Sequence, residues 1–352
     1  MEISVIIPTW NRAALLPETL DAVFAQTHPP LEVIVVDDGS TDQTAEMVTE
    51  RYGARVRLLQ IANGGDLAAR NAGLAVASGR LVAFCDSDDL WRPDFLAAMA
   101  ALWFAEPRLR AAFADFVLLR DGVCGTSTKF ADAPEGFWQG LRVLAPEGLA
   151  AFDKPIVERV IGFQPFFPSA MVADRQFLLA LGGWDASVGR TVGTDFATIL
   201  LLCEHPPIGI VHRPLVMIRK HPGGYSADVQ AMNLGDAAIL EHVLARRPSL
   251  RPLDQLIAES VARRRVQALE IAFARQDHAA VRGIWRLLPE PSKAWPLRMK
   301  AGVAAWRSPW RDWAVRGLLA IGTLRARVSS GRAARRAARC ERSGRAGNPA
   351  AG

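Results

Sequence analysis

The run Ile3-Ser4-Val5-Ile6-Ile7, followed directly by Pro8-Thr9-Trp10-Asn11-Arg12, decides the fold of this chain. An almost continuous apolar run is typical of a strand buried on both faces, because a strand with one face in water alternates apolar and polar residues. Similar runs predict buried strands over residues 31–36, 56–61 and 81–85. Apolar residues at helical spacing fill the intervals, and Pro93 opens a further helix at a position that proline tolerates.

Strands that alternate with helices predict an α/β fold, with a doubly wound, mostly parallel sheet and helices on both faces. Ligands of such sheets bind beyond the carboxyl ends of the strands. Residues 121–162 are irregular and rich in Gly, Pro and aromatic residues, and we interpret them as an insertion over that edge. We expect Thr194 to cap a helix that runs through Cys203, and residues 208–218 to form another strand.

Size and composition favour one large domain with a smaller appendage. The chain has 352 residues, half of them apolar, which is enough for a domain of about 220 residues. Its four cysteines form no Cys-x-x-Cys pair, which predicts a reducing compartment. No basic segment precedes a long apolar run, so we expect no signal peptide. The longest uncharged apolar stretch, residues 95–105, is shorter than the roughly 20 residues that span a bilayer. We therefore expect a cytoplasmic protein.

Charge divides the chain into two regions. Residues 1–240 hold 19 Lys and Arg against 28 Asp and Glu, whereas residues 241–352 hold 23 against 8. Opposite charge indicates two different tasks. We predict a catalytic α/β domain over residues 1–225, a basic helical region over 226–330 and a disordered, Arg-rich tail over 331–352.

Acidic side chains follow two of the predicted strands. Asp37 and Asp38 come after the second strand, and Asp86-Ser87-Asp88-Asp89 comes after the fourth. Carboxylates gathered at one edge of a sheet repel one another unless a cation or a donor-rich ligand lies between them. Side chains two residues apart in an extended segment point the same way, so Asp86 and Asp88 can face one partner. Such carboxylates suit Mg²⁺ or Mn²⁺ bridging a diphosphate, although each taken singly could be a turn or cap residue.

Four motifs in this order resemble glycosyltransferase family two. They are Val5-Ile6-Ile7-Pro8-Thr9-Trp10-Asn11-Arg12, Val35-Val36-Asp37-Asp38-Gly39-Ser40-Thr41-Asp42, Ala69-Arg70-Asn71-Ala72-Gly73 and Asp86-Ser87-Asp88-Asp89. The resemblance covers about residues 1–225 and implies the GT-A fold of nucleotide-diphospho-sugar transferases. No Gly-x-Gly-x-x-Gly follows the first strand, which argues against a dinucleotide-binding dehydrogenase.

The resemblance also implies roles for single residues at the nucleotide. Asp38 would hydrogen-bond the uracil ring, which favours a UDP-sugar, although a dTDP-sugar presents the same ring edge. Asp86 would approach the ribose, and Asp88 would bind the metal directly. Asp89 would either join them or cap the next turn. The predicted nucleotide-binding residues are Pro8, Thr9, Asn11, Asp38, Arg70 and Asp86.

Two later segments resemble the acceptor and metal parts of such a site. Asp195 stands ten residues after a Gly182-Gly183-Trp184-Asp185 loop, at the place of the family's general base, and Thr194 stands where a Glu is usual. Alternatively, Asp195 only begins a helix, where the dipole favours an acid. His221 resembles the histidine of a late Arg-x-His segment and would bind the metal or the diphosphate. His212 competes with it, and either His could be structural.

The resemblance implies an inverting, metal-dependent glycosyltransferase that uses Mg²⁺ or Mn²⁺. It would transfer a sugar from a nucleotide-diphospho-sugar to a hydroxyl of a glycan or lipid-linked acceptor, as in the synthesis of cell-envelope polysaccharides. The Gln-x-x-Arg-Trp motif of the family's processive polymerases is missing, so we expect one transfer per encounter. Because Thr194 departs from the family pattern, the alternative is a catalytically impaired sugar-nucleotide-binding or scaffolding protein.

The C-terminal third suggests an anionic membrane surface as a partner. Five of the ten tryptophans lie between Trp285 and Trp313, among many arginines. An apolar stripe with a basic back is typical of helices that lie on a membrane. This stripe contains Trp310, Trp313, Ala314, Gly317, Ile321, Leu324 and Val328. The protein would then be peripheral on the inner face of the cytoplasmic membrane. The alternative is a helix packed on the catalytic domain, and nucleic-acid binding is a third, less favoured interpretation.

Overall fold

Four parallel strands form the part of the sheet that the opening sequence predicts. The structure is a computed structural model that describes residues 1–221, 224, 227–306 and 315–318. Its strand β1 (Ile3–Thr9) lies between β2 (Glu32–Asp37) and β4 (Leu81–Phe84), and β3 (Arg57–Gln60) pairs with β2. All seven residues of β1 are buried, as its apolar run predicts.

The other half of the sheet mixes directions. The order is β3-β2-β1-β4-β10-β6-β11-β9-β8, in which β10 (Met171–Asp174) is antiparallel to both neighbours and β11 (Ile208–Lys220) is parallel to β6 (Ala111–Arg120). Two short strands flank this path: β5 (Leu90–Trp91) pairs with β11, and β7 (Val123–Thr128) pairs with β6.

The segment that the sequence leaves irregular, residues 121–162, is more ordered than expected. It contains β7, β8 (Arg142–Ala145), β9 (Leu149–Phe152) and helix α5 (Val157–Gly162). Strands β7 and β8 show no apolar alternation because their side chains are mostly exposed or half-buried. Pairing with neighbouring strands, rather than their own composition, makes them strands.

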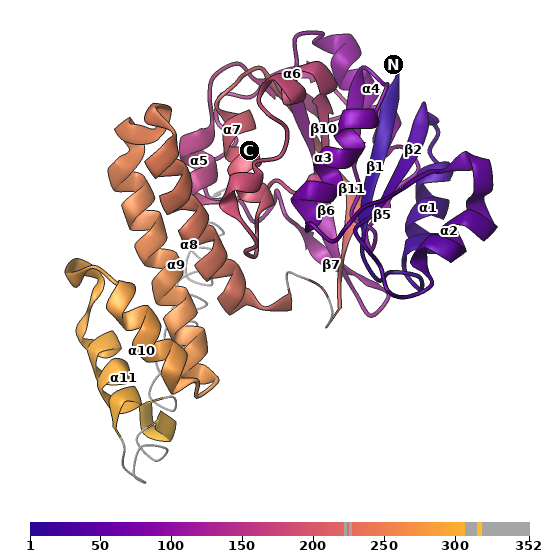
Figure 1. Ribbon diagram of the computed structural model, residues 1–352. Coiled ribbons are helices and arrows are strands. Elements are labelled where there is room, and N and C mark those ends of the chain that lie inside the picture. The colour runs from indigo at the N-terminus through magenta and orange to yellow at the C-terminus, as the bar shows by residue number, and fades with distance from the viewer. Residues whose placement is uncertain (222–223, 225–226, 307–314, 319–352) are drawn as a thin grey trace, which may run out of the picture. The chain divides into compact units, whose positions relative to one another are not determined.

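Helices cover both faces of the sheet, which confirms the doubly wound α/β architecture (Figure 1). On one face, α1 (Leu16–Phe24), α2 (Thr44–Tyr52) and α4 (Phe95–Ala105) bury side chains against one side of β1. On the other face the core cluster joins residues from α3 (Asp66–Val76), α5, α6 (Arg175–Ala180), α7 (Asp195–Cys203) and α8 (Val229–Arg246).

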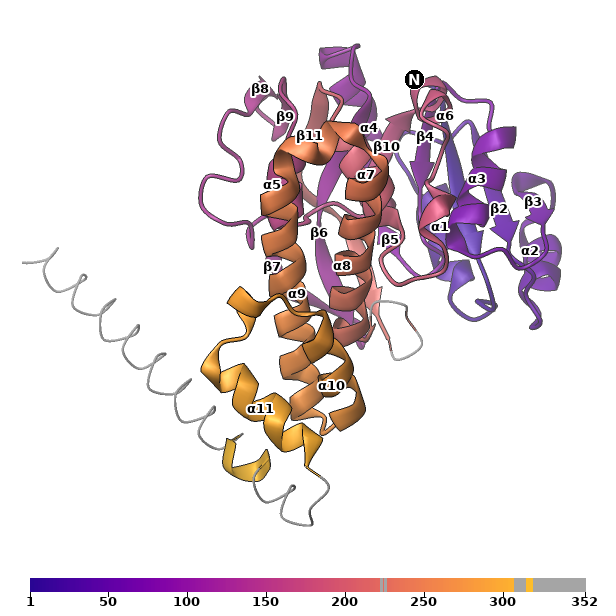
Figure 2. The ribbon, with the colours of Figure 1, turned by 60° about the vertical axis from the view of Figure 1, so that its left-hand side comes forward.

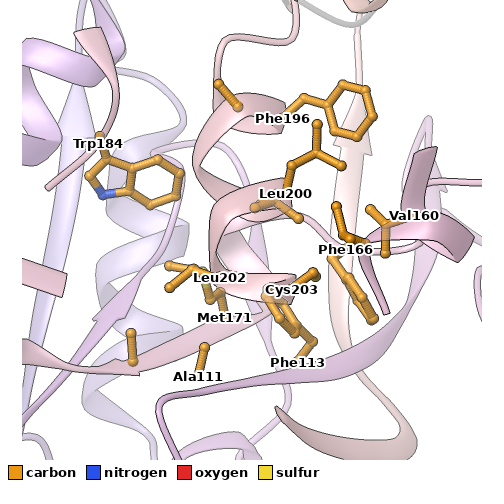
Figure 3. Close-up of a cluster of buried hydrophobic side chains, with 14 of the residues drawn as sticks. Ala111, Phe113, Val160, Phe166, Met171, Trp184, Phe196, Leu200, Leu202 and Cys203 are labelled. Atoms are coloured by element: carbon orange, nitrogen blue, oxygen red, sulfur yellow. The ribbon is translucent and has the colours of Figure 1, made fainter. Parts of the chain in front are cut away.

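Helix α7 is held firmly because it lies over an aromatic cluster (Figure 3). Phe196 and Leu200 are fully buried, and the rings of Phe113 and Phe166 stack beneath with their centroids 4.2 Å apart. Thr194 is the N-cap residue of this helix, as predicted, although its side chain makes no capping hydrogen bond. The Thr194 hydroxyl donates elsewhere, to Asp66.

After β11 the described chain is helical, as predicted (Figure 2). Helix α9 (Asp254–Ala274) follows α8, and α10 (His278–Leu287) and α11 (Trp295–Ala305) come next. The chain forms two compact units, Met1–Val261 and Ala262–Gly352. The functional division at residue 225 stays a prediction.

The expected membrane stripe falls largely outside the described residues, which exclude Trp310, Trp313, Ile321, Leu324 and Val328. The tail over 331–352 is also outside them. Where the structure describes the chain, it contains no helix that combines the length and the apolar character needed to cross a bilayer.

Candidate active site

A cleft of about 620 Å³ opens at the carboxyl ends of the parallel strands. Its lining comes from the residues that follow β1, β2 and β4, from the starts of α3 and α7, and from the end of β11. Of the residues predicted for the site, the cleft is lined by Pro8, Thr9, Asp38, Arg70, Asp86, Asp88 and Asp195. Segments as far apart in the sequence as Pro8 and Lys220 therefore converge on one cavity, at the edge that the sheet topology predicts.

Asp38 lies at one end of this cleft with its carboxylate fixed by backbone groups. Its Oδ1 accepts a hydrogen bond of 2.7 Å from the Gly64 amide, and its Oδ2 accepts one of 2.8 Å from Gly65. Thr9 Oγ1 is buried and has no hydrogen-bond partner among the described residues.

Asn11 does not line the cleft. Its φ of 52° is in the left-handed region, which Asn tolerates better than most residues. Its Oδ1 accepts a hydrogen bond of 2.8 Å from the Thr41 amide, and its own amide donates to Ser40 Oγ at 2.9 Å. Asn11 thus joins the loop after β1 to the loop after β2 and shapes the cleft from outside.

Arg70 is the buried cation of the site. Its guanidinium donates to Asp66 Oδ2 at 2.5 Å and to Asp86 Oδ1 at 2.6 Å, and it lies 5.0 Å from the ring centroid of Trp184. Burial opposes its charge, but the carboxylates of Asp86 and Asp66 outweigh burial and raise the pKa of Arg70.

The neighbouring Asn71 fixes the loop that carries Trp184. Its Oδ1 accepts from the Trp184 amide and its Nδ2 donates to the Trp184 carbonyl, both at 2.8 Å. Gly183 (φ +76°) is required here, because a Cβ at this position would lie 2.5 Å from Asn71 Oδ1. The Ala-Arg-Asn and Gly-Gly-Trp motifs are therefore one structural unit.

The three aspartates after β4 have three different environments. Asp86 pairs with Arg70, whereas Asp88 Oδ2 lies 2.9 Å from His221 Nε2 and 3.7 Å from Arg12 Nε. Asp89 is buried: it accepts hydrogen bonds from Ser169 Oγ at 2.5 Å and from the Arg219 amide at 2.9 Å. Burial raises the pKa of Asp89 well above its usual range. All three aspartates line the cleft, and Asp89 in addition joins it to β11.

The two candidate histidines lie in different places. His221 contacts Asp88, although it does not itself line the cleft. His212 packs edge-on against Trp138 and Phe130, with ring centroids 4.6 and 5.5 Å away, and burial lowers its pKa. His212 is therefore a packing residue outside the cleft, and His221 is the histidine that the fold brings to the acidic edge.

Asp195 begins α7 and has the most unusual environment of these acids. Its Oδ2 is buried and has no hydrogen-bond partner among the described residues. Burial raises the pKa of Asp195 to about 7 against the opposing charge of Arg70, with Asp66 adding to the rise. A carboxylate with an unused oxygen and a pKa near neutrality can accept a proton.

Asp185 differs from Asp195, although both follow the Gly-Gly-Trp loop. Its Oδ1 accepts from Ser187 and its Oδ2 from Arg247 at 3.1 Å. Burial would raise the pKa of Asp185, but these hydrogen bonds outweigh it and lower the pKa. Asp185 does not line the cleft, so it has neither the position nor the basicity of a proton acceptor.

The sequence analysis missed Asp66, which links Arg70 on α3 to Thr194 at the start of α7. Asp66 Oδ2 accepts hydrogen bonds from Arg70 Nη1 and from Thr194 Oγ1, the latter at 3.0 Å. The Thr194 hydroxyl thus reaches a carboxylate 128 residues away. The four-residue spacing of Asp66 and Arg70 on a helix was a readable signal, whereas the contact with Thr194 was not.

The residues present suit a divalent cation only in part. Asp88 and His221 are in contact and offer oxygen and nitrogen ligands. Within residues 1–221, 224, 227–306 and 315–318, no group of three His, Cys, Asp or Glu side chains could hold a metal. A cation at Asp88 would therefore need oxygens of the diphosphate or water to complete its coordination.

Comparisons with known proteins agree with this fold. Residues 4–114 match the model of glycosyl transferase family 2. An uncharacterised glycosyltransferase of Nostoc is 44% identical over 96 residues, which cover 26% of this chain and 30% of that protein. The TuaG glycosyltransferase of Bacillus subtilis, provisionally assigned by name to teichuronic acid biosynthesis, is 36% identical over 137 residues, which cover 38% of this chain and 53% of that protein.

Among solved structures, TarS residues 1–349 of Staphylococcus aureus in complex with UDP superimposes with a TM-score of 0.57 at 22% identity. The match covers 86% of this chain and 87% of that one, and it shows a shared fold. The architecture is the GT-A fold of nucleotide-diphospho-sugar transferases. The family model thus matches the N-terminal part of the chain, residues 4–114, which is similar to glycosyl transferase family 2.

Proposed function

We propose that this protein is an inverting, non-processive glycosyltransferase. It transfers a sugar from a nucleotide-diphospho-sugar, with UDP-sugars favoured, to a hydroxyl of a glycan or lipid-linked acceptor. The observation that carries the proposal is the environment of Asp195. A proton-accepting carboxylate lies in the same cleft as the acidic Asp86 and Asp88 and the buried cation Arg70.

The proposed reaction is a single displacement. Asp195 takes the proton of the acceptor hydroxyl, and the freed oxygen bonds to the anomeric carbon of the donor. The bond between that carbon and the diphosphate breaks on the opposite face, and the nucleoside diphosphate leaves with both bonding electrons. Asp38, whose carboxylate is fixed by the Gly64 and Gly65 amides, would accept a hydrogen bond from the ring N–H of a uracil or thymine base.

The proposed cofactor is Mg²⁺ or Mn²⁺. Asp88 would hold it directly and His221 would be its second protein ligand, while Arg12 lies close enough to reach the same diphosphate. When bound, the cation supplies charge stabilisation for the leaving diphosphate. Arg70 keeps Asp86 oriented toward the ribose whether or not the cation is present.

Thr194 does not by itself favour the impaired-enzyme alternative. Its hydroxyl is engaged with Asp66, so the start of α7 remains tied to Arg70.

Donor hydrolysis with Mn²⁺ tests the proposed function most simply. Catalysis is supported if the wild type hydrolyses the donor, and if Asp195→Asn still binds UDP but does not hydrolyse the donor. UDP binding by both proteins without any turnover would favour the binding or scaffolding role.

We also propose a peripheral location on the inner face of the cytoplasmic membrane. In the unit 262–352, the exposed fractions are 67% for Trp295, 50% for Trp306 and 53% for Leu287. Tryptophan side chains prefer the headgroup level, and the excess of basic residues beyond residue 240 attracts anionic lipids. A lipid-linked or envelope acceptor would be reached at that surface.

A further inference from the structure

A second pocket of about 550 Å³ adjoins the donor cleft. It lies between β6 and β7, and it shares Phe167 and Lys220 with the cleft. Lys220 ends β11, the strand from which Arg219 and His221 reach Asp89 and Asp88. A molecule bound in this pocket would therefore lie directly beside the donor.

The lining of this pocket is rich in cations. Arg120, Lys129 and Lys220 line it, against one carboxylate among the lining residues, that of Asp132. Asp132 Oδ1 already accepts a hydrogen bond of 2.8 Å from Ser127 Oγ. This excess of positive charge is unusual for its surroundings, because residues 1–240 as a whole hold more Asp and Glu than Lys and Arg.

Bringing these positive side chains together in a partly buried pocket is electrostatically unfavourable. Lys129 and Lys220 are half-buried. Burial lowers the pKa of the Lys129 ammonium; the Asp132 carboxylate opposes this fall, and Lys220 adds to it because like charges repel. The Lys129 ammonium lies 4.3 Å from the ring centroid of Phe163, which partly offsets its desolvation. An anion between these groups would relieve the repulsion.

We propose that this pocket is an acceptor subsite that binds an anionic group, a phosphate ester or a carboxylate, carried by the acceptor glycan. The proposal rests on the proposed glycosyl transfer, since it names the class of acceptor. Lys129 and Arg120 are cations that distinguish the subsite from the donor cleft, because they line the second pocket and not the first, and Lys129 is the less exposed of the two. Lys220 lines both and can contact either substrate.

The two anionic chemistries predict the same dependence on Lys129. The chain offers a matched control in Lys154, an exposed lysine that lines neither pocket. The proteins to compare are the wild type, Lys129→Gln, Lys129→Arg and Lys154→Gln. UDP is kept saturating throughout, so that the donor cleft is filled. The affinity of each variant for UDP is measured first, which identifies any variant with a damaged fold or donor site.

Glycerol 3-phosphate and glucuronate are then titrated by calorimetry as soluble probes. We expect Lys129→Gln to weaken at least one of them by about tenfold, as for the loss of one charge-assisted hydrogen bond. Lys129→Arg should restore most of the affinity, and Lys154→Gln should match the wild type. The probe that responds identifies the phosphate ester or the carboxylate as the acceptor's anionic group.

Three results would overturn the proposal. One is equal affinity of Lys129→Gln and Lys154→Gln for both probes. Another is a failure of both probes to bind the UDP-saturated wild type, which would mean that no anion site exists outside the filled donor cleft. The last is a dependence on Lys129 seen with phosphatidic acid vesicles but with neither soluble probe, which would assign the pocket to a lipid headgroup. None of these measurements requires turnover. The proposed subsite can therefore be refuted while the proposed glycosyl transfer still stands, and the reverse is also true.

Discussion

Replacing Asp195 by Asn should slow the enzyme and, at neutral pH, make it more stable. A carboxyl whose pKa rises from 3.8 unfolded to about 7 folded is roughly a thousandfold harder to ionise in the folded state. Folding then favours the protonated acid, so stability falls as pH rises from about 4 to about 7 and stays low above that. The largest such cost is about 4 kcal/mol, and relaxation around the charge would reduce it. Asn carries no charge and avoids this cost.

Two assays follow from this reasoning. Turnover of Asp195→Asn at pH 8 should fall by at least about 10²-fold, the low end for loss of a general base, with UDP affinity nearly unchanged. Wild-type kcat/KM should fall as pH drops through about 7, because the ionised form is the base. In thermal melts, the Tm of Asp195→Asn should be higher than that of the wild type at pH 8, and the difference should disappear near pH 4.

Asp185→Asn is the matched control, since Asp185 lies ten residues earlier and its pKa is lowered. Its ionised form stabilises the fold at neutral pH, a contribution that is lost as pH falls below its usual pKa. Asp185→Asn should therefore destabilise the protein at pH 8, the opposite sign. If Asp195→Asn also destabilises at pH 8, or retains most of its activity, the burial and the role assigned to Asp195 are refuted.

Further predictions concern the cation, the connecting carboxylate and the membrane. Asp88→Asn should abolish turnover and make UDP affinity independent of Mn²⁺; wild-type activity that survives EDTA would contradict this. Asp66→Asn should move the midpoint of the pH–rate profile to lower pH, because the Asp66 charge helps to raise the pKa of Asp195. Thr194→Val, which removes one hydrogen bond to Asp66, should lower kcat by less than Asp195→Asn, and an equal loss would mean that Thr194 acts on the substrate itself. The full chain should co-sediment with anionic vesicles at low salt and dissociate at high salt. A chain ended after Trp306 keeps Trp295 and Trp306 but lacks the predicted stripe that begins at Trp310, so it should bind more weakly; equal binding of both would favour a packed helix.

The sequence alone determined the half of the fold in which structure is local. Strands β1, β2 and β4 follow from apolar runs, and the helices between them from spacing, because each element buries the face that its own residues make apolar. Strand β3 also lies where a run predicts it, but it is an edge strand whose residues are exposed or half-buried, so the expectation of a buried strand there is wrong. The edge that binds ligands follows as well, since parallel strands all end on one side. The motifs of that edge sufficed to predict that Asp38, Asp86, Asp88 and Asp195 share a cleft.

Only the tertiary structure decided which of these residues touch. The approach of His221 to Asp88 spans 133 residues, and that of Thr194 to Asp66 spans 128. Such contacts depend on the order in which β10, β6 and β11 join the sheet, which no local pattern encodes. Tertiary structure also set the pKa values: burial raises those of Asp89 and Asp195, whereas hydrogen bonds lower that of Asp185. The chemistry of a carboxyl is set by its surroundings in space, and a sequence records only its neighbours along the chain.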